Sequence, residues 1–272
     1  MSVLRPRRSV LYMPAANERA LEKAKTLDAD SIIFDLEDAV APDSKESARK
    51  AACVAASSGE YGRRELTIRC NGLDTPWGAD DLAAIAASNA SAVVVPKVSS
   101  VAYLDDVAQR LAEAGAPGSM TVWAMIETPT AIFDVRAIAA HPSVSVLVMG
   151  TNDLAREVRA PLVPGRTALL AHLATAVLAA REAGKVILDG VYNDVKDLQG
   201  FERECRQAVE FGFDGKTLIH PGQIDIANQA WAPSAEEIDQ ARRTIAAFDA
   251  AVGFTLQPDA ACASRLAVQI TT

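Results

Sequence analysis

Short apolar runs rich in β-branched residues alternate along the chain with longer alanine-rich segments. The longer segments repeat apolar residues at i, i+3, i+4 and i+7, the spacing of one face of a helix. Several of them stop at a glycine, as at Gly115 and Gly184, which is common at helix ends. The pattern predicts strands that alternate with helices. The strand-like runs are residues 9–14, 31–37, 66–71, 92–98, 122–128, 144–150, 186–192 and 216–220.

Eight strands that are each followed by a helix fit an α/β fold of the (β/α)8 TIM barrel type. The runs are continuously apolar, which favours parallel strands buried on both faces. A doubly wound open sheet is the alternative, because periodicity alone does not show whether a sheet closes. We therefore expect a barrel over residues 1–230. Residues 231–272 are expected to form a short C-terminal appendage, a helix and an irregular tail packed on the barrel or on a neighbouring subunit.

Composition narrows the classes of function. The chain has 272 residues, half of them hydrophobic, and a net charge of −8, which argues against a nucleic-acid surface or a basic membrane patch. No run approaches the roughly 20 apolar residues of a membrane span, and the N-terminal stretch lacks the apolar core of a secretory signal. Four widely spaced cysteines fit neither a zinc site nor a disulfide framework. These features predict a cytoplasmic protein that binds neither membranes nor nucleic acids.

Polar residues gather at the ends of the predicted strands. In a (β/α)8 barrel, catalytic residues lie at the C-terminal ends of the strands and in the loops that follow. One such charge is usually solvated or paired with a neighbouring loop. Carboxylates and cations that converge on one rim must neutralise one another or hold a ligand. The rim set is Asp35, Glu37, Asp38, Arg69, Asn71, Lys97, Glu127, Thr128, Asn152, Asp153, Asp189, Tyr192 and His220.

Two carboxylates of this set point to a metal. Glu127 and Asp153 end adjacent predicted strands, so their oxygens can share one centre. Two carboxylates completed by waters suit Mg²⁺, whereas zinc is disfavoured because His141 and His172 fall in helical segments. Arg69 is the expected partner of an anionic substrate, since its planar fork matches a carboxylate.

Three other rim residues have more than one interpretation. Lys97 is expected to act electrostatically, with a Schiff-base role as the less favoured alternative. His220 precedes Pro221 and is either a general base or a structural hydrogen-bonding residue. Asp35 is expected to point into the barrel mouth and to pair with Lys97 or Arg69.

Seven motifs in order resemble those of the citrate lyase β-subunit-like branch of the HpcH/HpaI aldolase superfamily, the acyl-CoA lyases. They are RSVLYMPA, FDLEDAV, IRCN, VPKV, IET, GTNDLA and GFDGKTLIHPGQI, and they span residues 8 to about 224. The resemblance implies a Mg²⁺-dependent barrel that makes or breaks a carbon–carbon bond next to a CoA-type thioester. It also implies a homo-oligomer, a trimer or a multiple of one.

The resemblance also implies roles for individual residues. Glu127 and Asp153 match the metal ligands, and they would hold the bound keto acid through the metal. Arg69 matches the residue that contacts the substrate's carboxylate or carbonyl. Glu37 and Asp38 match carboxylates that support catalysis by holding metal-bound waters.

For the CoA moiety, the resemblance implies a place near Tyr12 and the turn that follows it. Arg7, Arg8 and Lys97 supply positive charge that could meet the CoA phosphates. One family feature is absent, an Asp-Gly-x-Met-type segment on a lid that reaches into a neighbouring subunit's site. The tail offers only Asp259 in its place, so the proton-transfer residue is unassigned.

The predicted function is cleavage or condensation of a malyl-, citramalyl- or citryl-type 3-hydroxyacyl-CoA into a 2-keto acid and an acyl-CoA. One alternative is the β subunit of a citrate lyase complex, which acts on a thioester of an acyl carrier protein. A second is a free-acid aldolase that joins pyruvate to an aldehyde, although the first two strands lack that group's early rim histidine. A third is a barrel that binds metal and keto acid without lyase activity.

Overall fold

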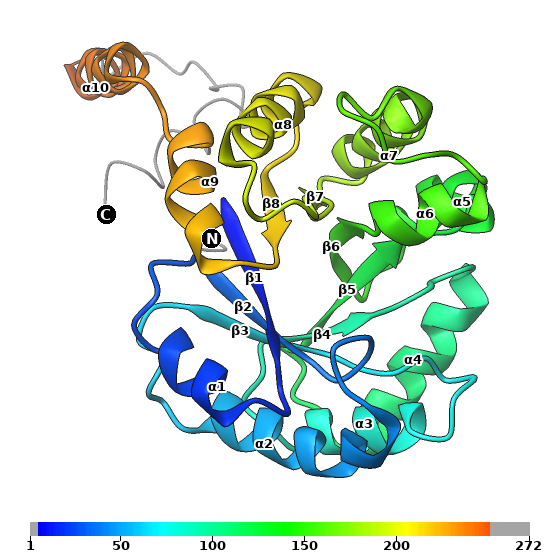
Figure 1. Ribbon diagram of the computed structural model, residues 1–272. Coiled ribbons are helices and arrows are strands. Elements are labelled where there is room, and N and C mark those ends of the chain that lie inside the picture. The colour runs from blue at the N-terminus through cyan, green and yellow to red at the C-terminus, as the bar shows by residue number, and fades with distance from the viewer. Residues whose placement is uncertain (1–4, 251–272) are drawn as a thin grey trace. The chain divides into compact units, whose positions relative to one another are not determined.

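Eight short parallel strands close into a barrel in the computed structural model, which describes residues 5–250 (Figure 1). The strand order follows the chain, and β8 pairs with β1 to complete the ring. The predicted (β/α)8 barrel is therefore confirmed, and the open sheet is excluded. The strands are β1 Ser9–Pro14, β2 Ser31–Asp35, β3 Glu65–Arg69, β4 Ala92–Val95, β5 Thr121–Ile126, β6 Val144–Met149, β7 Val186–Asp189 and β8 Gly215–Leu218.

Helices follow the strands and cover the outside of the barrel (Figure 1). Their ends follow local rules: the side chains of Asn17, Ser100 and Thr128 accept hydrogen bonds from first-turn N–H groups, and Gly212 ends a helix at φ 90°. Three short 3₁₀ turns occur at η1 Pro42–Ser44, η2 Thr167–Leu169 and η3 Pro221–Gln223. The α-helices are α1 Glu18–Ala24, α2 Lys45–Ser57, α3 Gly78–Ala86, α4 Val101–Glu113, α5 Pro129–Ala140, α6 Thr151–Glu157, α7 Leu170–Glu182, α8 Leu198–Phe211, α9 Ile224–Ala230 and α10 Ala235–Ala250.

The barrel interior is packed with apolar side chains. Val10, Ile33, Trp123, Val146 and Leu188 belong to one buried cluster with residues from six of the eight strands, and β4, β5 and β6 each contribute two alternate residues to it. This alternation continues to the strand ends, so a residue two positions beyond an interior residue also faces the barrel axis. The filled interior leaves the rim as the place for chemistry.

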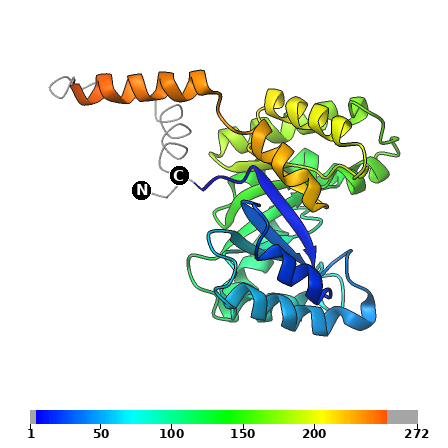
Figure 2. The same ribbon diagram turned by 60° about the vertical axis from the view of Figure 1, so that its left-hand side comes forward.

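The described residues fall into two compact units, and Arg7–Ala230 holds the whole barrel. Within this unit α9, orange in Figure 2, lies alongside the blue strand β1. Helix α10 belongs to the other unit. The packing of residues 231–272 stays a prediction, and Asp259 lies outside the described residues. No helix between residues 5 and 250 is long and apolar enough to cross a membrane.

Candidate active site

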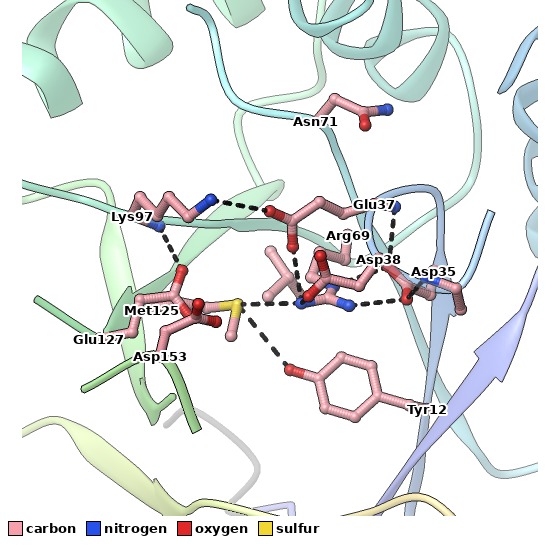
Figure 3. A network of polar contacts seen from close by, with 12 residues as sticks. Tyr12, Asp35, Glu37, Asp38, Arg69, Asn71, Lys97, Met125, Glu127 and Asp153 are labelled. Atoms are coloured by element: carbon pink, nitrogen blue, oxygen red, sulfur yellow. Dashed lines mark hydrogen bonds and ion pairs between the residues drawn. The ribbon is translucent and has the colours of Figure 1, made fainter. Parts of the chain in front are cut away.

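Arg69 and Asp35 form a buried ion pair at the rim (Figure 3). They end neighbouring strands in register, two positions beyond interior residues. Arg69 Nε and Nη2 each lie 2.7 Å from one oxygen of Asp35, which is the bidentate geometry. The Asp35 carboxylate also accepts the backbone N–H groups of Glu37 at 2.9 Å and Ala39 at 3.1 Å. The predicted pairing of Asp35 with Arg69 is confirmed, and it ties the following turn to the guanidinium.

The remaining contacts of Arg69 lie toward the barrel mouth. Its Nη1 atom is 2.7 Å from Glu37 Oε2 and 3.6 Å from Asp38 Oδ2. Its Cζ atom lies 4.8 Å from the centroid of the Tyr12 ring. Burial by itself would lower the pKa of the guanidinium, but Asp35, Tyr12 and Glu37 raise it well above its ordinary value. Arg69 is therefore a fixed cation whose orientation several neighbours define.

Glu127 is placed by two backbone features. It follows β5 and is 1 % exposed, and its Oε1 atom accepts the N–H of Lys97 at 2.7 Å. Lys97 adopts φ 48°, an uncommon left-handed conformation for a non-glycine residue. At Gly150, after β6, a Cβ atom would lie 2.3 Å from Glu127 Oε2, so only glycine leaves room for this carboxylate.

Asp153 completes a pair of carboxylates with Glu127. It lies in the first turn of α6, and both side chains line the same cavity (Figure 3). Burial, Glu37 and Asp153 together raise the pKa of Glu127 to about 7. Burial and the nearby Asp38 and Asp35 likewise raise the pKa of Glu37 to about 7. Crowded carboxylates of this kind favour a bound cation.

The donor set fits Mg²⁺. Between residues 5 and 250, no three His, Cys, Asp or Glu side chains are grouped so that they alone could hold a metal. Glu127 and Asp153 would thus leave the other coordination positions to water and substrate oxygens, as Mg²⁺ commonly does. A closed zinc site needs more nitrogen or sulfur ligands than this rim supplies.

Glu127, Asp153 and Arg69 line a cavity of about 390 Å³ at the barrel mouth. Met125 and Met149 supply apolar lining between these charged groups. Across the mouth, the amides of Asn152 and Asn193 exchange two hydrogen bonds of 3.0 and 2.8 Å. The volume suits a small acid, and the open mouth leaves room for a longer group attached to it.

Lys97 reaches the site from the edge. Its side chain is about half exposed, and its Nζ atom lies 3.9 Å from Glu37 Oε1. This geometry supports an electrostatic role. His220 makes a structural hydrogen bond: its Nδ1 atom accepts the N–H of Gly222 at 3.0 Å, and Gln223 completes a capping box at η3. Thr128 likewise caps a helix, by accepting the N–H of Ala131.

Asp189 does not belong to the rim set, and its inclusion there was wrong. Leu188 occupies the barrel interior, so Asp189 faces the helical layer instead. It is buried and bonded to Lys216 at 2.6 Å and to Arg166 at 2.7 Å, and both cations also contact Glu204 of α8. Burial alone would raise the pKa of Asp189, but Lys216 and Arg166 lower it. Tyr192 is also engaged elsewhere, donating to Asp197 at 2.9 Å.

The prediction for Arg7 and Arg8 was also wrong. Both precede β1 and therefore lie at the opposite end of the barrel from the rim. Arg7 is bonded to Glu65 at 2.6 and 2.8 Å, and Arg8 to Asp30 at 2.8 and 2.9 Å. Neither can meet a ligand bound at the C-terminal ends of the strands.

Lys45 is a supporting residue that the sequence analysis missed. It lies in a charged segment typical of a solvated helix face, yet it is 6 % exposed. Its Nζ atom donates to the carbonyl oxygens of Leu36 and Glu37 and to Asn71 Oδ1, each at 2.7 Å. Asn71 is thus bonded to Lys45 and does not line the cavity. Only the tertiary contacts reveal this role.

Comparison with known proteins identifies relatives along nearly the whole chain. The family model of HpcH/HpaI aldolase/citrate lyase matches residues 8–221. A (3S)-malyl-CoA thioesterase of Cereibacter sphaeroides is 50% identical over 246 residues, which cover 90% of this chain and 84% of the relative. The citrate lyase subunit beta of Escherichia coli is 36% identical over 255 residues, or 91% of this chain and 84% of that protein.

Among solved structures, the protein CitE of Mycobacterium tuberculosis in complex with magnesium, acetoacetate and coenzyme A has a TM-score of 0.76. It is 29% identical to this chain, and the match covers 98% of both. The family model spans all eight strands and every rim residue discussed above. The chain therefore belongs to the HpcH/HpaI aldolase/citrate lyase family.

Proposed function

We propose that the protein is a Mg²⁺-dependent carbon–carbon lyase. It cleaves a malyl-type 3-hydroxyacyl-CoA into a 2-keto acid and an acyl-CoA, or condenses these two into the 3-hydroxyacyl-CoA. The observation that carries the proposal is the meeting of Glu127, Asp153 and Arg69 in one cavity. A relative that is 50% identical to this chain is named for (3S)-malyl-CoA, which supports malyl as the acyl group of the substrate. CitE, which binds magnesium, acetoacetate and coenzyme A, supports the ligand classes.

The charges of the rim support a metal. Carboxylates outnumber cations around the cavity, so an anionic substrate would be repelled from it without further positive charge. Mg²⁺ held by Glu127 and Asp153 would supply that charge and act as a Lewis acid toward the substrate's oxygens. Glu37 and Asp38 are assigned to the waters around it.

Arg69 is assigned to the substrate. Asp35 and Glu37 hold the guanidinium in place, so Arg69 is already oriented toward charge that develops during the reaction. Loss of one such preorganised contact typically costs about 3 kcal/mol in the barrier. Tyr12, beside the guanidinium, and Lys97, at the edge, are assigned to substrate binding.

A second candidate reaction is hydrolysis of the same thioester. The similarity to proteins named (3S)-malyl-CoA thioesterase favours it, because these are more similar to the chain than is the citrate lyase subunit beta. Both reactions use a thioester carbonyl beside Arg69, but hydrolysis releases malate and CoA. The similarity to citrate lyase subunits keeps an acyl carrier protein as a further possible thioester carrier.

The test is incubation of the purified protein and Mg²⁺ with malyl-, citramalyl- and citryl-CoA. Released keto acid and released CoA thiol are measured separately, since carbon–carbon cleavage releases the first and hydrolysis the second. We expect keto acid from malyl-CoA. Thiol without keto acid would establish the hydrolase instead, and no product from any thioester by the Mg²⁺-loaded protein would contradict both.

We further infer that the protein is cytoplasmic and forms a homotrimer or a multiple of one, in which residues 231–272 pack on the barrel or on a neighbour. The widely spaced cysteines support the location, and the family membership supports the assembly. Light scattering coupled to size-exclusion chromatography measures the assembly directly.

A further inference from the structure

We propose that Tyr12 donates a hydrogen bond, together with Arg69, to the thioester oxygen on which negative charge develops. The inference rests on the proposed function but holds for both candidate reactions. In carbon–carbon cleavage the electrons of the broken bond move onto this oxygen, and in hydrolysis the attack of water places charge on the same atom. A donor pair at that point lowers either barrier.

The first observation is the direction of the Tyr12 side chain. Tyr12 alternates with Val10 along β1 and faces the barrel axis, where its ring packs against the guanidinium of Arg69. Tyr12 and Met125 both line the cavity, and the Tyr12 hydroxyl donates to Met125 Sδ at 3.8 Å (Figure 3). The phenol thus presents its polar end to the cavity.

The second observation is that another donor converges on the same sulfur. Arg69 Nη1 lies 4.0 Å from Met125 Sδ, while Nε and Nη2 are engaged by Asp35. A thioether is a weak acceptor, so the Tyr12 hydroxyl is not well satisfied there, whereas Arg69 Nη1 also pairs with Glu37 Oε2 at 2.7 Å. A substrate oxygen beside Met125 would receive a neutral hydrogen bond from Tyr12 in place of its weak one to sulfur, and a charged one from the Nη1 group of Arg69, which carries a second N–H besides the one that faces Glu37.

Two other tyrosines of the barrel, Tyr61 and Tyr192, show the usual partner of a structural hydroxyl. Tyr61 donates to the carbonyl oxygen of Leu21 at 3.1 Å, and Tyr192 donates to Asp197 at 2.9 Å. Buried tyrosine hydroxyls normally find an oxygen partner of this kind. Tyr12 has a sulfur instead, at the wall of a cavity. Burial also raises the pKa of Tyr12 above its ordinary value, so the hydroxyl keeps its proton.

The test compares Tyr12→Phe with Tyr103→Phe in the full-length, Mg²⁺-loaded protein, with malyl-CoA as substrate. Tyr12→Phe keeps the ring beneath Arg69 and removes only the hydroxyl. Tyr103 lies on α4 outside the cavity, and its hydroxyl accepts the N–H of Leu73. We expect Tyr12→Phe to lower kcat about 100-fold, with KM and Mg²⁺ affinity changed less than about twofold. Tyr103→Phe is expected to keep the wild-type kcat.

Several outcomes overturn the inference. A wild-type kcat in Tyr12→Phe, or a raised KM alone, would show that the hydroxyl is not used in the transition state. Lost Mg²⁺ binding, a lowered Tm, or an equal loss in Tyr103→Phe would assign the hydroxyl a structural role. If the wild type is active and Tyr12→Phe keeps the wild-type kcat, this inference fails but the proposed function stands. If the wild type turns over no thioester, both fail together.

Discussion

Arg69 and Glu127 show at the scale of single residues how burial sets the cost of a charge. Both are almost inaccessible to solvent. The charge of Arg69 is compensated by the bidentate carboxylate of Asp35, whereas Glu127 has only a backbone N–H and faces other carboxylates. Arg69 therefore stabilises the folded rim without a ligand. The negative charge of ionised Glu127 is not compensated by the protein, so a bound cation would stabilise it.

This difference predicts the behaviour of Glu127→Gln. The pKa of Glu127 rises from 4.5 to about 7 on folding, so the folded metal-free protein holds this proton more tightly than the unfolded chain. The stability of the metal-free wild type is thus expected to fall as the pH rises from 4.5 to 7. At pH 8 the glutamine variant should be more stable than the metal-free wild type, by on the order of 1–3 kcal/mol.

Thermal unfolding with and without Mg²⁺ measures both effects. Mg²⁺ should raise the Tm of the wild type and leave that of Glu127→Gln unchanged. The matched control is Glu182→Gln, which alters an exposed pair with Arg136 and should retain the response to Mg²⁺. Normal Mg²⁺ binding by Glu127→Gln would show that Glu127 is not a metal ligand.

At the scale of elements, the approach of β5 to β6 brings the two candidate metal ligands together. Gly150 directly follows β6, and the next residues begin α6, which carries Asp153. The absent side chain of Gly150 leaves the space that Glu127 occupies. The close contact between strand ends thus depends on one glycine.

Gly150→Ala should therefore disturb the metal site. The new Cβ atom would lie 2.3 Å from Oε2 and 2.4 Å from Cβ of Glu127, so the carboxylate must move. We expect Mg²⁺ affinity to fall at least about tenfold and stability to fall by about 1–3 kcal/mol, as measured by calorimetric titration and chemical unfolding. In the control Gly118→Ala, the added Cβ has no atom within 4 Å and should change neither quantity.

Helix α2 supports the rim through its first residue, Lys45. Lys45→Met would leave the acceptors at Leu36, Glu37 and Asn71 without their buried donor. We expect a loss of about 2–3 kcal/mol in unfolding free energy and a lower kcat, because the turn that carries Glu37 is no longer held. The control Lys50→Met on the same helix removes only an exposed pair with Glu46. Equal effects of the two substitutions would contradict the role of Lys45.

At the scale of the whole molecule, the barrel unit contains every side chain that we assign to the metal and the substrate. Barrel closure requires β8 to pair with both β7 and β1. The buried cluster of Asp189, Lys216 and Arg166 lies where β7, β8 and α8 meet. The site is thus formed within Arg7–Ala230.

Truncation after Ala230 is the corresponding prediction. The shortened chain should still fold and bind Mg²⁺ with wild-type affinity, because Glu127, Asp153 and Gly150 lie in the barrel unit. We expect its turnover to be lost if a group in residues 231–272, such as Asp259, transfers the proton. Circular dichroism, calorimetric titration and the thioester assay separate these effects. A truncated chain with full activity would place the proton-transfer group in the barrel.

Much of the fold and part of the site could be predicted from the sequence. Eight apolar runs separated by helical segments predicted the alternating strands and helices, because burial on two faces and helical periodicity are local signals. Their number favoured a barrel, but only the pairing of β8 with β1 showed that the sheet closes. Polar residues directly after these runs then identified the rim. For Asp35, Arg69 and Glu127 the positions were sufficient, since alternation along a strand turns them toward the barrel axis.

The tertiary structure decided which polar residues share the cavity and which serve the framework. Asp189, Lys45 and His220 carry the same kinds of groups as the rim residues, yet their partners are buried cations outside the cavity, carbonyl oxygens or a capping N–H. These partnerships depend on which face of a strand a residue occupies and on contacts distant in sequence. A pattern of residue types thus determines where charge can accumulate. Only folding decides whether each charge is compensated by the protein or left to bind a ligand.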